Sequence, residues 1–238
     1  PTETDLRPNP DQILRQLDFW FGGQTKGEID VGTYDGTNKL NVFQRFGLHE
    51  LETLAEYACD MNRRPGRSMY FRPALVEENA PVFVKDKHFL RAPGIWCDLD
   101  KEGQAERASI VASTTRPNMV VVTGRHPYVR AQMFWRTDEA IADPDTLRRL
   151  NSRASDLFGG DSLVINPTSL MRLAGTIAWP RKQGRVLELT DLKLFSDDRP
   201  KQYPVAAIER AFPQTERAET RARHDADPFH SFGGRVFS

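Results

Sequence analysis

Residues 94–100 read Gly94-Ile95-Trp96-Cys97-Asp98-Leu99-Asp100. The large apolar residues predict a buried strand, and this strand ends in two carboxylates separated by one leucine. Side chains at positions i and i+2 of a strand point to the same face, so Asp98 and Asp100 converge. Converging carboxylates repel each other unless a cation lies between them, and hard oxygen ligands favour Mg²⁺ or Mn²⁺. The stretch predicts a divalent-metal site, with a solvated acidic turn as the alternative.

A second stretch, residues 120–136, predicts two strands joined by a basic turn. The run 120–123 is apolar enough for a buried strand, and 132–136 forms the next one. Glycine in the turn lets backbone N–H groups approach a phosphate. The candidates for contact with nucleotide phosphates or a base are Thr123, Gly124, Arg125, His126, Arg130 and Gln132. An exposed basic hairpin is the alternative.

A third stretch, residues 166–182, places Arg172 within an apolar run. A buried guanidinium needs an anionic partner, which here is Asp98, Asp100 or a substrate phosphate. Lys182 follows the turn at Gly175 and can reach a phosphate as a point charge. The alternative for Arg172 is a structural role where a loop meets the sheet.

The pattern along the chain predicts an α+β fold with a mainly antiparallel sheet. We expect two short strands within 23–46 and mixed loop and strand over 171–179. Helices are expected at 9–21, 47–62, 104–113, 138–158 and 204–212, and strands at 68–76, 93–99, 120–123, 132–136, 163–166 and 186–195. Residues 1–212 are expected to form a single domain, and 213–238 a polar, flexible tail.

Taken in order, the three stretches resemble the archaeo-eukaryotic primase superfamily, the primase-polymerases of plasmid, phage and integrated-element replication. The first motif is Trp96 to Asp100, and the second is Thr123-Gly124 followed by Gln132 to Trp135. The third is Arg172-Leu173-Ala174-Gly175-Thr176 with Lys182 downstream. The resemblance implies a catalytic core with an RRM-like, mainly antiparallel sheet packed by helices, and it covers residues 68–182 well.

The chain departs from the family pattern at two positions. Gln132 stands where the second motif usually has a His. Some plasmid-type branches of the family resemble this version with Gln. Asn166 stands where the third motif usually supplies a third metal carboxylate, so it is a further candidate ligand that carries no charge. Asp161 and Asp191 are the alternative carboxylates nearby in sequence.

The resemblance implies a DNA primase that makes or extends primers on a single-stranded template by Mg²⁺- or Mn²⁺-dependent nucleotidyl transfer. Asp98 and Asp100 are the implied catalytic residues, nucleoside triphosphates the substrates, and a replicative helicase or helical-bundle primase domain a partner. The alternative is a non-catalytic replication module of the same fold that binds single-stranded DNA or nucleotide and recruits a helicase. A nicking enzyme is disfavoured, since the five His residues are scattered and no His pair is present.

Composition agrees with a folded protein of the cytoplasm. The 238 residues include two Cys, which we expect to be buried free thiols, and no apolar run approaches the ~20 residues of a membrane span. The 33 basic and 33 acidic residues cancel, which disfavours a basic surface made for duplex DNA. Residues 116–185, however, contain ten Arg and one Lys against six acidic residues. The charge therefore predicts a local electropositive site.

Overall fold

A nine-stranded sheet organises the structure, a computed structural model that describes residues 6–34, 40–111, 115–195 and 202–212. Its order is β11-β6-β7-β5-β4-β1-β3-β8, with β2 also paired to β1, and every ladder in the described residues is antiparallel. The strands are β1 Glu28–Tyr34, β2 Leu40–Gly47, β3 Ser68–Phe71, β4 Leu75–Val76, β5 Phe89–Leu99, β6 Met119–Gly124, β7 Arg130–Ile141, β8 Met171–Arg172 and β11 Asp191–Leu194. The separate pair β9 Ile177–Ala178 and β10 Glu188–Leu189 forms a small hairpin. The α+β class and the mainly antiparallel sheet are confirmed.

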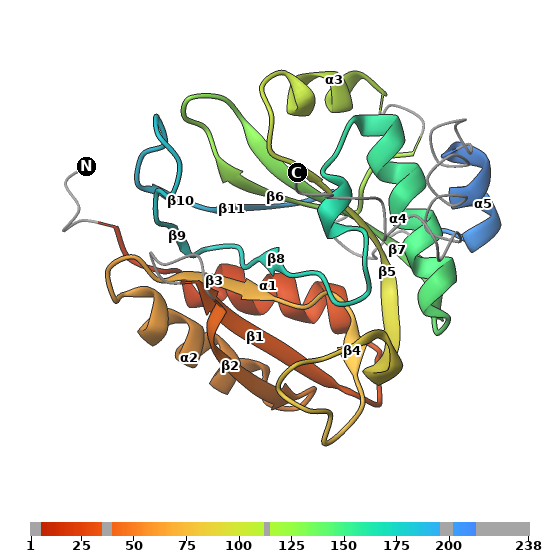
Figure 1. Ribbon diagram of the computed structural model, residues 1–238, viewed down its shortest axis with the longest axis horizontal. Helices are drawn as coiled ribbons and strands as arrows, with labels where there is room; N and C mark the ends of the chain where they lie inside the picture. The colour runs from red at the N-terminus through yellow and green to blue at the C-terminus, as the bar shows by residue number, and fades with distance from the viewer. Residues whose placement is uncertain (1–5, 35–39, 112–114, 196–201, 213–238) are drawn as a thin grey trace, which may run out of the picture.

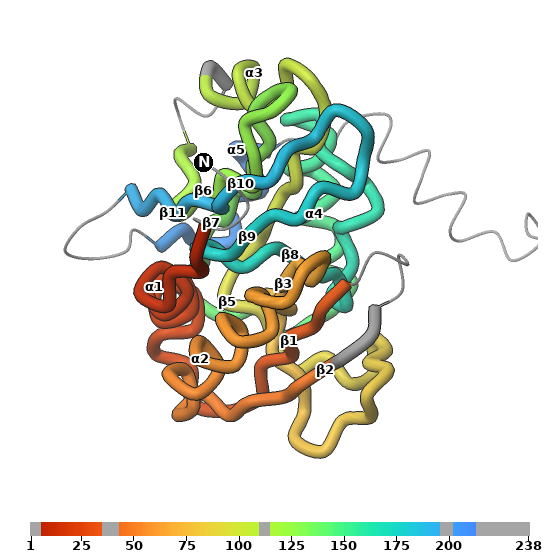
Figure 2. The backbone as a smooth tube through the Cα atoms, turned by 90° about the vertical axis from the view of Figure 1, so that its left-hand side faces the viewer, coloured from red at the N-terminus to blue at the C-terminus, as the bar shows by residue number. Residues whose placement is uncertain are grey.

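Helices cover the two halves of the sheet separately (Figure 1). The half built on β1 carries α1 Pro10–Phe21 and α2 Leu51–Asn62, which pack on each other. The half built on β5, β6 and β7 carries α3 Gln104–Val111, α4 Pro144–Phe158 and α5 Val205–Ala211. Figure 2 shows α1 and α2 together at one end and α3 at the other, with β8 and β9 between. The chain between β8 and β10 therefore runs where the two halves meet.

Helix ends follow local signals in the sequence. Asn9 caps α1 by accepting a hydrogen bond from the Gln12 backbone N–H, and Pro10 occupies the first turn. Asp143 caps α4 in the same way, and Gly159 ends that helix in the left-handed region at φ 71°. The prediction of a helix from residue 138 was wrong at its start, because 138–141 continue β7. The dipeptide Asp143-Pro144 marks the true helix start.

Three predicted strands differ from the structure. The strand predicted at 68–76 is two strands, separated by a turn at Pro73 whose carbonyl accepts a hydrogen bond from Trp20 Nε1 at 2.8 Å. The prediction at 163–166 was wrong, because Ser162–Val164 form a 3₁₀ turn capped by Asp161. The strand predicted at 186–195 divides at Thr190, whose hydroxyl donates to the carbonyl of Leu173 at 2.9 Å.

The core lies between the helices and the central pair β5 and β7. Trp96 and Trp135 are fully buried there, and Trp135 stacks on Phe158 of α4 with centroids 5.5 Å apart. A Cβ at Gly94 would lie 1.9 Å from the carbonyl oxygen of Trp135, so only glycine allows these strands their close approach. Cys59 and Cys97 are buried and free, as predicted. Among the described helices, none is long and apolar enough to cross a membrane.

Candidate functional site

Asp98 and Asp100 lie at the end of β5, where the two halves of the sheet meet. Asp98 is opposite Gln132 of β7 in the strand register, and the Gln132 side chain hydrogen-bonds its carboxylate. The amide oxygen of Gln132 also accepts a hydrogen bond from the Arg172 backbone N–H at 2.8 Å. Gln132 therefore ties β5, β7 and β8 together at this point.

The two carboxylates have opposite electrostatic surroundings. Burial, reinforced by the charges of Asp100 and Asp161, raises the pKa of Asp98 to about 7, against the opposing effects of Gln132 and Arg172. Burial also acts to raise the pKa of Asp100, but hydrogen bonds from Lys182 and Arg185 outweigh it and hold that pKa below its usual value. Lys182 Nζ lies 2.6 Å from one oxygen of Asp100, and Arg185 Nη2 lies 2.7 Å from the other.

A cavity of about 440 Å³ opens beside these two acids. We call it the acid–base pocket, because cationic side chains face Asp98 and Asp100 across it. The predicted site residues that line it are Asp98, Asp100, Thr123, Arg130, Gln132, Arg172 and Lys182. Arg185 also lines the pocket and was not predicted, although it lies only three residues beyond Lys182. Tyr34 and Tyr70, from the opposite half of the sheet, were not predicted either. The long-range pairing of β3 with β8 is what brings Tyr70 opposite Arg172.

Arg172 enters the pocket with part of its guanidinium unused. Its Nη2 donates to the Tyr70 hydroxyl at 2.6 Å, and its guanidinium carbon lies 4.5 Å from the centroid of the Tyr70 ring. Its Nη1 is buried and has no hydrogen-bond partner. Tyr34 stands edge-on to Tyr70 at 5.1 Å, and Arg181 lies over the Tyr34 ring at 4.8 Å. The wall therefore alternates cations and aromatic rings, with one guanidinium nitrogen available to a ligand.

The turn after β6 is occupied by Glu188 of β10. Its carboxylate accepts hydrogen bonds from the backbone N–H groups of Arg125 at 2.8 Å and His126 at 3.4 Å, and pairs with Arg130 at 3.2 Å. The Arg125 side chain pairs with Asp191 at 3.0 Å. Gly124, Arg125 and His126 are not among the described residues that line the acid–base pocket. The turn does hold an anion, as its backbone predicts, but in this structure that anion is a side chain of the same protein.

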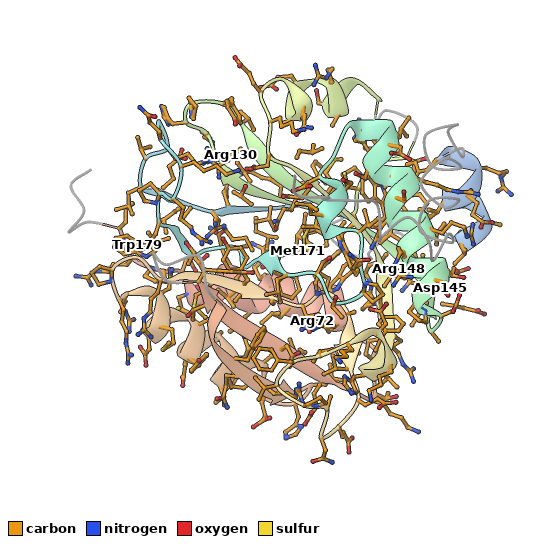
Figure 3. The ribbon with its side chains drawn as sticks, viewed as in Figure 1. Arg72, Arg130, Asp145, Arg148, Met171 and Trp179 are labelled. Carbon is orange, nitrogen blue, oxygen red and sulfur yellow. The ribbon has the colours of Figure 1, made fainter. Side chains whose placement is uncertain are left out.

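None of the three candidates for a further metal ligand, Asn166, Asp161 and Asp191, lines the acid–base pocket. Asn166 accepts a hydrogen bond at 3.0 Å from Arg148 of α4, which also pairs with Asp86. Arg148 pairs with Asp145 as well, and Figure 3 labels both residues beside α4. Asp161 donates its backbone N–H to the Asp98 carbonyl at 2.8 Å and caps the 3₁₀ turn with its carboxylate. Asp191 pairs with Arg125 and Lys193.

The carboxylates at the end of β5 fit a hard cation that needs few ligands from the protein. Among the described residues, no group of three or more His, Cys, Asp or Glu side chains is placed to hold a metal ion. Mg²⁺ nevertheless uses one or two carboxylates together with waters and substrate phosphates. Asp98 and Asp100 supply that number of carboxylates, and the cations around them supply sites for phosphate.

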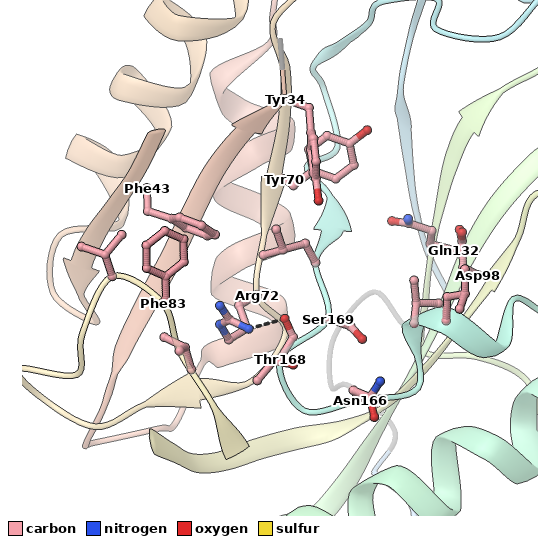
Figure 4. Close-up of a pocket in the computed structure, with 15 residues that line it drawn as sticks. Tyr34, Phe43, Tyr70, Arg72, Phe83, Asp98, Gln132, Asn166, Thr168 and Ser169 are labelled. Carbon is pink, nitrogen blue, oxygen red and sulfur yellow. Dashed lines mark hydrogen bonds between the residues drawn. The ribbon is translucent and has the colours of Figure 1, made fainter. Parts of the chain in front are cut away.

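A second cavity of about 520 Å³ adjoins the first (Figure 4). We call it the aromatic pocket, because Phe43 and Phe83 form one wall and Tyr34 and Tyr70 stand at its edge. Asp98 and Gln132 lie on the opposite wall. Asp98 thus faces both cavities.

Solved structures with the same fold share little sequence with this chain. The AEP domain of the cyanophage S-2L primase-polymerase superposes with a TM-score of 0.60 at 17% identity, covering 87% of this chain and 100% of that one. Primase RepB′ gives 0.59 at 17% identity, covering 90% and 66%. The catalytic domain of RepB′, solved in complex with initiator DNA, gives 0.57 at 14%, covering 91% and 100%. No family model and no curated protein matches the sequence. The chain has the archaeo-eukaryotic primase fold, which confirms the resemblance at the level of structure.

Proposed function

We propose that this protein is a DNA primase or primase-polymerase that joins nucleotides on a single-stranded template with the help of Mg²⁺ or Mn²⁺. The observation that carries the proposal is the acid–base pocket. Two carboxylates at one strand end face Arg130, Arg172, Lys182 and Arg185, and an Arg172 nitrogen is left without a partner. Carboxylates for a metal beside cations for a triphosphate are what nucleotidyl transfer requires.

Each side chain has a distinct task in this proposal. Asp98 and Asp100 would hold the divalent cation. When bound, the cation would lower the pKa of the attacking 3′-hydroxyl and neutralise charge on the leaving pyrophosphate. Gln132 orients the Asp98 carboxylate through its hydrogen bond. Arg130 and Arg172 would bind the phosphates, and Thr123 lies on the same wall.

Lys182 and Arg185 would bind first Asp100 and then the triphosphate of the substrate. Both are held by Asp100 in the structure described here. A divalent cation bound at the Asp100 oxygens would repel an ammonium and a guanidinium held by the same carboxylate. We therefore expect both side chains to exchange Asp100 for the triphosphate oxygens when substrate binds.

The names of the structural neighbours support the wider proposal. They are a phage primase-polymerase and a primase, and one was solved with initiator DNA. We propose that residues 1–212 form the catalytic domain, and that it acts in the cytoplasm in the replication of a plasmid, phage or integrated element. A helicase or helical-bundle primase domain is the proposed partner. Residues 213–238 lie outside the described part of the chain.

Primer extension tests the proposal. The protein is incubated with a primed single-stranded template, labelled nucleotides and Mn²⁺, beside the double variant Asp98→Ala, Asp100→Ala. We expect extension by the wild type and none by the double variant, with both folded by circular dichroism. Asp60→Ala is the matched control, because Asp60 is an exposed acid that pairs with neighbouring Arg63 and lines neither of the two cavities. Full activity in the double variant refutes the assignment of the two acids.

A non-catalytic module of the same fold is the second candidate. One observation favours it: Asn166, where the family pattern has a carboxylate, is uncharged and bound to Arg148. Single-stranded DNA binding without extension or dinucleotide synthesis, in Mg²⁺ and in Mn²⁺, would establish this candidate in place of the first.

A further inference from the structure

Large apolar side chains of the kind that folded proteins usually bury are exposed around the aromatic pocket. Val82, Phe83 and Leu163 are 60%, 79% and 80% exposed, and all three line this cavity. Within the described part of the chain five large hydrophobic residues are exposed, and four of them line one of the two cavities. Exposed apolar groups gathered around a cavity mark a binding site for a ligand with apolar faces.

The aromatic pocket is continuous with the acid–base pocket. Tyr34, Tyr70, Asp98 and Gln132 line both cavities. A ligand in the aromatic pocket therefore lies directly beside the groups that we assign to the metal and the triphosphate. This placement favours an occupant that is part of the same reaction.

The lining also indicates the chemistry of the occupant. Phe43 and Phe83 present flat apolar faces on one side of the cavity, and the Asn166 amide and Ser169 hydroxyl lie on the other (Figure 4). Such a lining suits a planar ring with hydrogen-bonding edges. Arg72 is bound to Asp30 and to the Thr168 carbonyl, so it does not provide a phosphate site here.

Positively charged side chains suited to the phosphates of a nucleic-acid backbone lie close to Phe83 in the chain. Lys85 and Lys87 follow it in sequence and are exposed. Aromatic faces beside exposed cations are the usual arrangement for binding single strands, because bases stack while lysines contact phosphates.

We propose that the aromatic pocket binds an unpaired base of a single-stranded nucleic acid by stacking on Phe83. The inference rests on the proposed function in one respect, since that function makes the neighbouring pocket the place where a template is copied. It adds the site at which the strand is held before it reaches Asp98.

Binding of a short fluorescent oligothymidylate, measured by anisotropy without metal or nucleotide, tests this proposal. Phe83→Ala should weaken binding about 5- to 150-fold, the range for loss of one base–aromatic stack. Phe83→Trp should bind as tightly as the wild type or more tightly. Phe195→Ala is the matched control, because Phe195 is 54% exposed and is not among the residues lining the two cavities. An abasic strand of the same length should bind the wild type and Phe83→Ala equally.

Two results would overturn the proposal. One is an unchanged dissociation constant for Phe83→Ala, and the other is an equal loss for the abasic strand, which would assign Phe83 to the backbone. If Phe83→Ala abolishes self-association in sedimentation and leaves DNA binding intact, the pocket is an interface between two copies, and the proposal is wrong. A wild type that fails to extend primers but shows the Phe83 effect refutes the proposed function and leaves this inference standing.

Discussion

Two clusters of acids and bases lie in the same sheet, and they are built in different ways. In the first, Asp30 of β1 receives Arg45 Nε at 2.7 Å on one oxygen and Arg72 Nε at 3.1 Å on the other. Asp30 and Arg72 are only 1% and 3% exposed. In the second, Asp98 and Asp100 face a cavity, and Arg172 keeps an unpartnered nitrogen.

This difference separates a structural role from a binding role. In the Asp30 cluster each oxygen of the buried carboxylate pairs with an arginine, so the cluster holds the β1 half of the sheet together. Beside Asp98 and Asp100, one guanidinium nitrogen of Arg172 lacks a hydrogen-bond partner, which is costly in a folded protein unless a ligand makes use of it. The comparison predicts that changes in the first cluster affect stability and changes in the second affect binding.

The largest expected effect is on stability, for Asp30→Ala. Removing this carboxylate leaves the buried Arg72 without its anion, which costs about 3–5 kcal/mol. Denaturation in urea measures the loss. Asp60→Ala, which removes an acid 68% exposed in a surface pair, should cost no more than about 1 kcal/mol. Equal costs for the two variants would contradict the structural role of Asp30.

The next effect is on substrate binding, for Arg172→Ala. Loss of a charged hydrogen-bond donor from the acid–base pocket should raise the Michaelis constant for nucleotide about 10- to 150-fold, with a smaller change in kcat. Arg149→Ala is the control, because Arg149 is exposed and pairs with Glu209 of α5. Steady-state primer extension gives both constants. The same Michaelis constant in both variants would show that Arg172 is structural.

The smallest effect is the pH dependence of stability in the metal-free protein. The pKa of Asp98 rises from 3.8 to about 7 on folding, so between these values the folded state binds more protons than the unfolded state. The contribution of Asp98 to stability therefore falls as pH rises from about 4 to 7. At pH 8 in EDTA, Asp98→Asn should raise Tm by about 2–4 °C, the shift that ~1 kcal/mol produces at this chain length. At pH 4 the two proteins should have the same Tm.

Asp100, two residues after Asp98, should contribute a pH dependence of stability with the opposite sign. Its pKa is lowered on folding by Lys182 and Arg185, so its contribution to stability is present at neutral pH and is lost as pH falls through the folded pKa. Asp100→Asn should therefore lower Tm at pH 8, measured by the same thermal scans in EDTA. A rise in Tm for Asp100→Asn, or a fall for Asp98→Asn, would contradict the electrostatic account of the site.

Local sequence patterns predicted much of this molecule. The apolar run into Asp98 and Asp100 specified a buried strand and the direction of both carboxylates, because strand periodicity is a local property. Asn9-Pro10 located α1 for the same reason. The wrong start of α4 came from weighing Asp138 above the stronger signal at Asp143-Pro144.

Contacts between segments far apart in the chain could not be predicted from local sequence patterns. Nothing local relates Tyr70 to Arg172, which are 102 positions apart, or Arg72 to Asp30, which are 42 apart. The occupation of the turn at Arg125 by Glu188 depends on the pairing of β9 with β10, and no residue near Arg125 signals it. Residue types indicated which chemistry was present, and the sheet order determined which charges meet.

Mn²⁺ binding is the sharpest test of the proposal that Asp98 and Asp100 are the metal ligands. Isothermal titration of the full chain, with a non-hydrolysable nucleotide present, would compare the wild type with the double variant Asp98→Asn, Asp100→Asn and the control Asp60→Asn. We expect Mn²⁺ to bind the wild type and the control alike, and the double variant at least about 10-fold more weakly, because the amides that replace the carboxylates carry no charge to attract the cation. Equal Mn²⁺ affinity in all three proteins would contradict the assignment of Asp98 and Asp100 as the metal ligands.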